Sequence, residues 1–331
     1  MSNTGYLLVF CEDDGSRAPA LISLEVLGLG RKLAGKMGLE LAAVATAGIA
    51  EEIKVCADAK VFTAPAPPGD GYRPEWYVAL LEETCRRIFP DAILFGHTPL
   101  GQDLAPRLAQ RLDAGVVTDV VGLSVEEGSL LATKPVQGGI GIATYGFNRS
   151  PRIVTVRPRV GTVPDRKESN LGEVIEIEVA KSAGQRPWEL IERIREESDE
   201  IKLEDADIVV AGGRGIGGSE GFETIRELAQ LLGAAVGSSR PPCDLGWITS
   251  SRQIGITGTI IGPQLYIALG ISGASQHLSG IGDSKTIIAI NKDREADIFR
   301  IANYGIIGDY RQVLPTLIDT LRTLRGPGDK R

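Results

Sequence analysis

The sequence has 331 residues with 43% hydrophobic side chains, which is long enough for two domains and too apolar for intrinsic disorder. Its net charge of −7 and its aromatic content of 5% argue against nucleic acid or an anionic membrane surface as a partner. Residues 205–331 contain equal numbers of basic and acidic side chains, so the excess negative charge belongs to residues 1–204. The second half therefore does not repel an anionic ligand.

The cysteines and the first residues indicate a cellular compartment. No two cysteines form a Cys-x-x-Cys pair, so neither a disulfide nor a zinc or other metal site is expected. The chain enters a strand-like run at once, without a basic region or a long apolar segment. We therefore expect a cytoplasmic protein with no membrane insertion. The cysteines are Cys11, Cys56, Cys85 and Cys243.

Short apolar runs alternate with helical patterns over residues 6–112, which is typical of right-handed βαβ units around a parallel sheet. Strands are predicted at Tyr6–Cys11, Leu39–Thr46, Lys60–Ala64 and Asp91–Gly96, and helices at 20–37, Pro74–Phe89 and Leu100–Leu112.

The pattern changes after residue 116, where strands follow one another without helices. They either extend the sheet or form a small β appendage. Residues 163–170 read as a connector, 172–179 as a strand and 188–199 as a charged helix between two domains, 1–200 and 201–331. The consecutive strands are predicted at Val116–Val125, Leu130–Pro135, Ile140–Tyr145 and Ile153–Arg157.

The second domain opens with a strand at Asp205–Gly213 that ends in a G-x-G-x-x-G turn before a helix at 219–233. Such a turn can place a phosphate at a helix N-terminus, but the acidic residue that would hold a ribose in an NAD site is not evident. Further strands at Leu265–Gly270 and Thr286–Ile290 and a helix at Arg311–Arg325 complete the pattern. The fold class predicted is α/β, with two doubly wound parallel-sheet domains and a small β extension in the first.

Residues 238–291 place glycines and hydrogen-bonding side chains between short apolar runs. Glycine allows backbone to approach a ligand closely, at an entropic cost in regular structure. This composition favours loops shaped around a large polar ligand, and a cofactor is the natural candidate.

Several ordered motifs in this region resemble those of the electron-transfer flavoprotein alpha subunit, and the likeness covers most of residues 205–325. The Gly-Arg-Gly turn at 213–215 and Ser239-Arg240 fall where that family has them. The other motifs are Gly255-Ile256-Thr257-Gly258, LYIALGISGASQHLSGI, IIAINKD, Ala302-Asn303-Tyr304-Gly305 and Gly308-Asp309.

The resemblance implies the alpha subunit of a heterodimer, with FAD in the C-terminal domain and the first domain facing a beta subunit. Such a protein carries electrons between a dehydrogenase, of the acyl-CoA type in fatty acid oxidation, and an acceptor such as a quinone oxidoreductase. A carrier needs no nucleophile or acid–base pair. The sequence agrees, because it contains only two histidines and no evident triad or carboxylate pair.

The resemblance also assigns residue roles. Thr257 would offer its hydroxyl to flavin N5, Arg240 would place positive charge near the isoalloxazine, and His277 would lie near the flavin C2 carbonyl. For each, a turn residue, a surface ion pair or a structural histidine is the competing interpretation. The full cofactor-binding set is Arg214, Ser239, Arg240, Gln253, Ile254, Gly255, Ile256, Thr257, Ser272, Gly273, Ala274, Ser275, Gln276, His277, Asn291 and Asp309.

One departure from the family concerns the turn itself, where Ile256-Thr257-Gly258-Thr259 replaces the Gln-Thr-Gly-Lys of many members. The missing side-chain donor and positive charge leave FAD binding expected but the flavin potential open. Three alternatives also stay open: a bifurcating complex that oxidises NADH, a pyridine-nucleotide oxidoreductase, and a partner subunit whose cofactor site has decayed.

Overall fold

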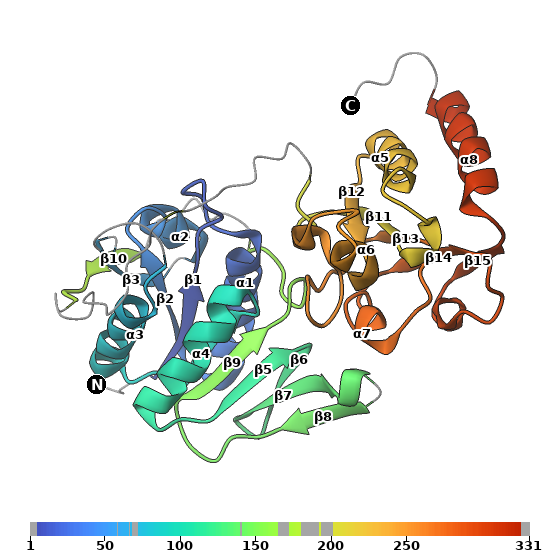
Figure 1. Cartoon of the computed structure of the whole chain (residues 1–331). Coiled ribbons are helices and arrows are strands. Elements are labelled where there is room, and N and C mark those ends of the chain that lie inside the picture. The colour runs from blue at the N-terminus through green and yellow to red at the C-terminus, as the bar shows by residue number, and fades with distance from the viewer. Residues whose placement is uncertain are drawn as a thin grey trace. The chain divides into compact units, whose positions relative to one another are not determined.

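The structure is a computed structural model that describes residues 5–57, 59–65, 67, 72–139, 141–164, 172–179, 192 and 201–325. The chain divides into two compact units, residues 1–195 and 196–331 (Figure 1). Residues 165–170 of the connector predicted over 163–170 fall outside the described residues, as does the helix predicted over 188–199 apart from residue 192.

The first unit is built on a seven-stranded parallel sheet with the strand order β10-β3-β2-β1-β4-β9-β5. The order reverses between β1 and β4, as in other doubly wound sheets. The predicted α/β fold class is therefore confirmed for this unit. The strands are β1 (Tyr6–Cys11), β2 (Glu40–Thr46), β3 (Lys60–Ala64), β4 (Ala92–Gly96), β5 (Val116–Val120), β9 (Arg152–Val156) and β10 (Glu173–Glu176).

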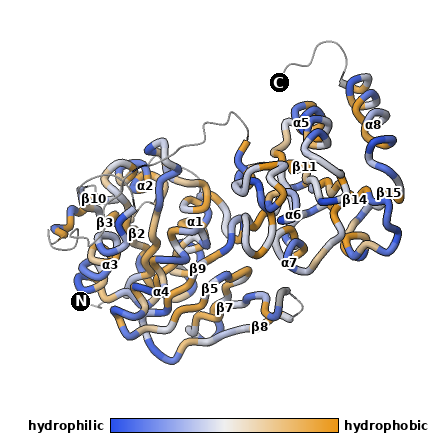
Figure 2. The backbone as a smooth tube through the Cα atoms, viewed as in Figure 1, coloured by the Kyte–Doolittle hydropathy of each residue, from blue (hydrophilic) through white to orange (hydrophobic). Residues whose placement is uncertain are grey.

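Helices cover both faces of this sheet because successive strand side chains point to opposite sides. Leu7 and Val9 of β1 pack with α1 (Leu21–Met37) and α2 (Ala50–Ala57). Leu8 and Phe10 pack with α3 (Pro74–Ile88) and α4 (Pro99–Leu112). Figure 2 shows hydrophobic residues along the central strands. The short helix α2 was not predicted from the sequence.

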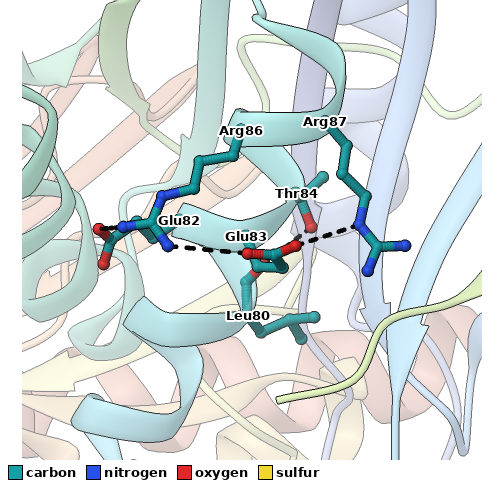
Figure 3. A network of polar contacts seen from close by, with 6 residues as sticks. All are labelled: Leu80, Glu82, Glu83, Thr84, Arg86 and Arg87. Atoms are coloured by element: carbon teal, nitrogen blue, oxygen red, sulfur yellow. Dashed lines mark hydrogen bonds and ion pairs between the residues drawn. The ribbon is translucent and has the colours of Figure 1, made fainter. Parts of the chain in front are cut away.

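Helix α3 shows how its sequence separates the two faces. Trp76 and Leu81 are buried in the core, while Glu82, Glu83, Arg86 and Arg87 form ion pairs on the outer side (Figure 3). The Arg86–Glu82 pair measures 2.6 Å and the Arg87–Glu83 pair 3.3 Å. Exposed pairs of this kind stabilise a helix by about 0.3–0.5 kcal/mol each. Burial of the apolar side contributes about 1.5–3 kcal/mol per large side chain and therefore stabilises the helix more than the ion pairs do.

The strand predicted over Val116–Val125 is wrong as a single element, because the chain bends within it. Asp119 adopts φ +64°, and the pairing of β5 with β9 shifts register between Val117 and Val120. A bulge of this kind ends one strand and redirects the chain. The following strands β6 (Gly122–Glu126), β7 (Ser129–Val136) and β8 (Gly141–Tyr145) form the antiparallel β extension, which confirms the expected appendage.

The second unit contains a five-stranded parallel sheet with the order β12-β11-β13-β14-β15, reversing between β11 and β13. Helices α5 (Gly221–Leu232) and α8 (Tyr310–Arg325) pack on one face. The glycine-rich loops, with the short helix α7 (Ser275–Leu278), pack on the other. The edge strands β12 and β15 were not predicted. The strands are β11 (Ile208–Gly212), β12 (Ala235–Ser238), β13 (Leu265–Leu269), β14 (Thr286–Asn291) and β15 (Tyr304–Ile307).

Glu12 follows β1 at the point where the order of the first sheet reverses. Burial raises the pKa of this half-buried carboxyl to about 7, against the opposing effect of Thr98, whose hydroxyl donates to it at 2.8 Å. A carboxyl whose pKa is raised by folding keeps its proton longer in the native state than in the unfolded chain. Glu12 therefore lowers the free energy of unfolding as pH rises from about 4.5 to about 7.

We expect Glu12→Gln to remove this pH-dependent decrease in the free energy of unfolding, because the amide is neutral at every pH and still accepts from Thr98. Thermal unfolding at pH 4.5, 6 and 8 should show a smaller decrease in Tm with pH than in the wild type. Glu126→Gln, at the exposed end of β6, is the matched control and should leave the profile unchanged. Parallel profiles for wild type and Glu12→Gln would contradict this expectation.

Candidate functional site

The expected cofactor residues follow the carboxyl ends of all five strands in the second sheet. Because the strands are parallel, these ends lie along one edge, where ligands bind in doubly wound folds. At about 4.8 Å between neighbouring strands, the edge extends over about 19 Å. The residues are Arg214 after β11, Ser239 and Arg240 after β12, Ser272–His277 after β13, Asn291 at the end of β14 and Asp309 after β15.

Two amides of the G-x-G-x-x-G turn, which connects β11 to α5, bind the connection that follows β13. The amide of Gly213 donates to the Leu269 carbonyl at 2.8 Å, and the amide of Gly215 donates to the Gly270 carbonyl at 3.0 Å. A Cβ at Gly213 would lie 2.3 Å from the Gly270 oxygen. The glycines therefore serve the close approach of β11 and β13, and these two amides are used within the chain.

Residues 253–259 form a tight loop with Ile256 and Thr257 exposed at its tip. The Thr259 amide donates to the Gln253 carbonyl at 2.8 Å and closes the loop. The Gln253 side-chain amide donates to Thr257 Oγ1 at 2.9 Å. Because the hydroxyl oxygen accepts this bond, its own proton remains able to point outward to a ligand.

His277 differs from the other expected residues because its side chain is buried, with 5% exposed. Nδ1 lies 3.0 Å from the Ile254 carbonyl and Nε2 lies 2.8 Å from the Tyr266 hydroxyl. Burial lowers the pKa of His277 to about 4, so the ring is neutral at physiological pH. A contact from this ring to a ligand would require one of the two internal hydrogen bonds to break.

The two arginines at the edge have different environments. Arg240 is exposed and pairs with Asp244 at 3.1 Å within α6 (Arg240–Asp244), which is the surface ion pair that competes with a cofactor role. Arg214 is exposed and makes no ion pair with any carboxylate in the described parts of the chain. Its guanidinium is therefore available to an anionic group.

At the far end of the edge, polar side chains shape the loop ends. Asn291 donates to the Ile271 carbonyl at 2.8 Å, and Asp309 pairs with Lys292 at 2.9 Å. The Lys292 ammonium holds the pKa of Asp309 below its usual range. These contacts agree with loop-capping roles and leave ligand contacts from Asn291 and Asp309 as predictions.

The remaining expected residues divide by exposure. Ser239 and Ile254 are buried, as are Gly255 and Gly273, which favours contributions through backbone or loop shape over side-chain contacts. Sequence reasoning missed Tyr266, because it lies within the apolar run of β13 and reads as core. The exposed members are Ser272, Ala274, Ser275 and Gln276.

Gly273 offers a direct test of the loop after β13. Its φ is +87°, and a Cβ there would lie 2.2 Å from the Ile298 amide nitrogen. We expect Gly273→Ala to lower the free energy of unfolding by more than about 1 kcal/mol, because the backbone must move. Gly282→Ala is the matched control, since its Cβ would meet nothing closer than 3.7 Å. Denaturant unfolding measures both, and equal stabilities would contradict the close contact.

The part of the chain that the structure covers contains no group of three or more His, Cys, Asp or Glu side chains suited to hold a metal ion. Within the same residues, no helix is long and apolar enough to cross a membrane.

Comparison with known proteins agrees with this geometry. Residues 7–182 match the family described as electron transfer flavoprotein domain, and residues 202–282 match the electron transfer flavoprotein FAD-binding domain. The chain is 42% identical over 311 residues to electron transfer flavoprotein subunit alpha of Thermoanaerobacterium thermosaccharolyticum, covering 92% of this chain and 94% of the relative. It is 38% identical to electron transfer flavoprotein subunit alpha of Bacillus subtilis, covering 92% of this chain and 93% of the relative. Protein FixB of Clostridium saccharobutylicum is 39% identical, with 90% of each chain covered. The chain therefore belongs to the electron transfer flavoprotein alpha subunit family, and its second unit contains the FAD-binding domain of that family.

Proposed function

We propose that this chain is the alpha subunit of a heterodimeric electron carrier, with FAD bound along the carboxyl edge of the second sheet. It would accept electrons from a dehydrogenase, of the acyl-CoA type in fatty acid oxidation, and pass them to an acceptor such as a quinone oxidoreductase. The observation that supports this most is the row of polar residues after all five strands. An edge of about 19 Å suits an extended dinucleotide.

Individual side chains suit FAD for identifiable physical reasons. Arg214 supplies a positive charge after β11 that pairs with no carboxylate of the residues the structure describes, which favours binding of a pyrophosphate. The outward hydroxyl of Thr257 provides a neutral donor at the tip of a short loop, where a flavin nitrogen can accept it. Bound FAD supplies the redox chemistry, and the chain's residues bind it, orient it and adjust its electrostatic surroundings.

A carrier role agrees better with the site than catalysis of a hydride transfer. A pyridine-nucleotide enzyme would use the G-x-G-x-x-G amides for the pyrophosphate. Here the amides of Gly213 and Gly215 donate to carbonyls of the neighbouring strand connection. The histidine of the region, His277, is buried and engaged at both ring nitrogens, which makes it a poor general acid or base.

The remaining parts of the proposal concern partners and location. We assign residues 1–200 to a domain that faces an electron transfer flavoprotein beta subunit, and residues 201–331 to the FAD domain. All four cysteines are free thiols, which fits a reducing compartment such as the cytoplasm.

The first test of the function is reconstitution. We expect the chain and a cognate beta subunit to form a 1:1 complex in light scattering, with the yellow spectrum of bound FAD. Electron transfer from an acyl-CoA dehydrogenase to a dye acceptor should depend on that complex. One flavin per alpha subunit indicates a simple carrier, whereas a second FAD indicates a bifurcating complex. A flavin-free complex would refute the proposed function.

The second test concerns Arg214. We expect Arg214→Ala to weaken FAD binding about tenfold, a loss of about 1.4 kcal/mol, because one charge-assisted contact to phosphate is removed. The wild-type affinity should fall more steeply with added salt than that of the variant. Arg322→Ala is the matched control, because Arg322 lies on α8 and pairs with Glu227 at 2.7 Å. An unchanged FAD affinity of Arg214→Ala at low salt would show that Arg214 is a surface residue without a role in FAD binding.

A further inference from the structure

The side chain of Gln253 reaches across the loop 253–259 and contacts Thr257 at its tip. The Gln253 side-chain amide donates to Thr257 Oγ1 at 2.9 Å. Gln253 is half-buried at the base of the loop, whereas Thr257 is exposed. The hydrogen bond therefore joins a residue that the fold holds in place to one that a ligand can reach.

Backbone contacts fix the base and the turn of this loop. The Gln253 carbonyl accepts from the Thr259 amide at 2.8 Å, and the Gly258 amide donates to the Gly255 carbonyl at 3.0 Å. Gly258 lies so close to the base that a Cβ there would be 2.3 Å from the Gln253 carbonyl oxygen. The side-chain bond from Gln253 then restricts what the backbone leaves free, which is rotation of the Thr257 side chain and of its hydroxyl.

The chemistry of the two groups fixes the direction of this hydrogen bond. An amide N–H only donates, so Thr257 Oγ1 must accept from Gln253. A hydroxyl has a single proton, and that proton then points away from Gln253. Thr257 is therefore held as a donor toward whatever covers the tip of the loop.

A hydroxyl held as a donor distinguishes two forms of a flavin. N5 of oxidised flavin has no proton and accepts a hydrogen bond, whereas N5 of fully reduced flavin carries a proton and donates. A fixed donor binds the oxidised form better, while a hydroxyl that rotates freely can also accept from the reduced form. A difference in affinity between two forms shifts the equilibrium between them.

We propose that Gln253 is a positioning residue for flavin binding, which acts through Thr257 by holding its hydroxyl as a donor. The inference rests on the proposed function, in which that hydroxyl donates to a flavin nitrogen. Water competes for the bond while the tip is exposed, and a ligand that covers the tip excludes this water and strengthens the bond. Gln253 thereby affects the flavin potential as well as the affinity for FAD.

The first test uses the alpha–beta complex and the variant Gln253→Met. Methionine is about as long as glutamine but cannot make this hydrogen bond, so the Thr257 hydroxyl becomes free to rotate. We expect the dissociation constant of oxidised FAD to rise about threefold relative to that of reduced FAD, which redox titration records as a higher midpoint potential. Gln230→Met, at an exposed position of α5, is the matched control and should change neither quantity.

Gln253→Glu reverses the direction of the same hydrogen bond. A carboxylate only accepts, so the Thr257 hydroxyl donates inward and no proton remains for the ligand. We expect the affinity for oxidised FAD to fall about tenfold. The added negative charge contributes to this loss, and the same substitution made together with Thr257→Val, which has no hydroxyl, measures the contribution of the charge alone.

The double variants decide whether Gln253 acts through Thr257. In the Thr257→Val background, Gln253→Met should change neither the affinity for FAD nor the midpoint potential, and Gln253→Glu should cost less affinity than it does alone. Equal effects of Gln253→Met with and without the Thr257 hydroxyl would overturn the proposal, because Gln253 would then act independently of Thr257.

The outcomes also distinguish this inference from the proposed function. If the wild-type complex binds no FAD, the proposed function fails, and methyl NMR of the flavin-free complex still decides the role of Gln253, since Thr257 should keep one rotamer in the wild type and average over several in Gln253→Met. If wild type and Gln253→Met have equal affinities and potentials, the inference fails while the function stands. Should Gln253→Met not fold, Gln253→Glu decides, because an equal loss of affinity in the Thr257→Val background contradicts the coupling.

Discussion

The close backbone contact between the turns after β11 and β13 governs the geometry of the second unit. Gly213 and Gly215 donate to the Leu269 and Gly270 carbonyls, and there is no space for a Cβ at Gly213. The sheet order reverses at this point, so a doubly wound fold would otherwise open a crevice here. The contact draws the two turns together and leaves Arg214 exposed beside them, where its charge is available at the carboxyl edge.

This contact also explains why a familiar motif does not have its usual meaning. The spacing G-x-G-x-x-G describes a tight turn between a strand and a helix, and that much is present before α5. Phosphate binding requires in addition that the turn's amides be free, which depends on the neighbouring strand connection. Gly270, more than fifty residues later in the sequence, accepts from the amide of Gly215 and removes it from that set. No local pattern reveals such a partner.

The sequence predicts those parts of the fold that bury continuous apolar runs. Tyr6–Cys11 and Lys60–Ala64 are strands with the predicted bounds, since their side chains are largely buried. The edge strands β12 and β15 were not predicted, because β12 has only four residues, two of them glycine and serine, and β15 is exposed throughout. The split of Val116–Val125 depends on the positive φ of Asp119, which hydrophobic periodicity does not reveal.

For the site, likewise, the sequence predicts where residues lie but not which groups they bond to. Family motifs place the expected residues in sequence, and the parallel sheet places them along one edge, but neither shows what each side chain bonds to. His277 illustrates the difference, because a lone histidine in a cofactor motif is equally compatible with a ligand contact and with a buried hydrogen bond. Its partners, Tyr266 and the Ile254 carbonyl, come from a strand and a loop 11 and 23 residues away.

The turn at the tip of this loop has a further electrostatic consequence. Ile256 and Thr259 are uncharged, so the turn itself adds no positive charge, and Arg240 shares its charge with Asp244. Exposed pairs such as this are weak, at about 0–1 kcal/mol, so an anionic ligand can compete with the carboxylate for the guanidinium. Arg214, which has no carboxylate partner among the described residues, needs no such exchange. We therefore expect the positive charge for an anionic cofactor to come from Arg214 and Arg240, after β11 and β12, and the turn at 256–259 to contribute shape and the neutral hydroxyl of Thr257.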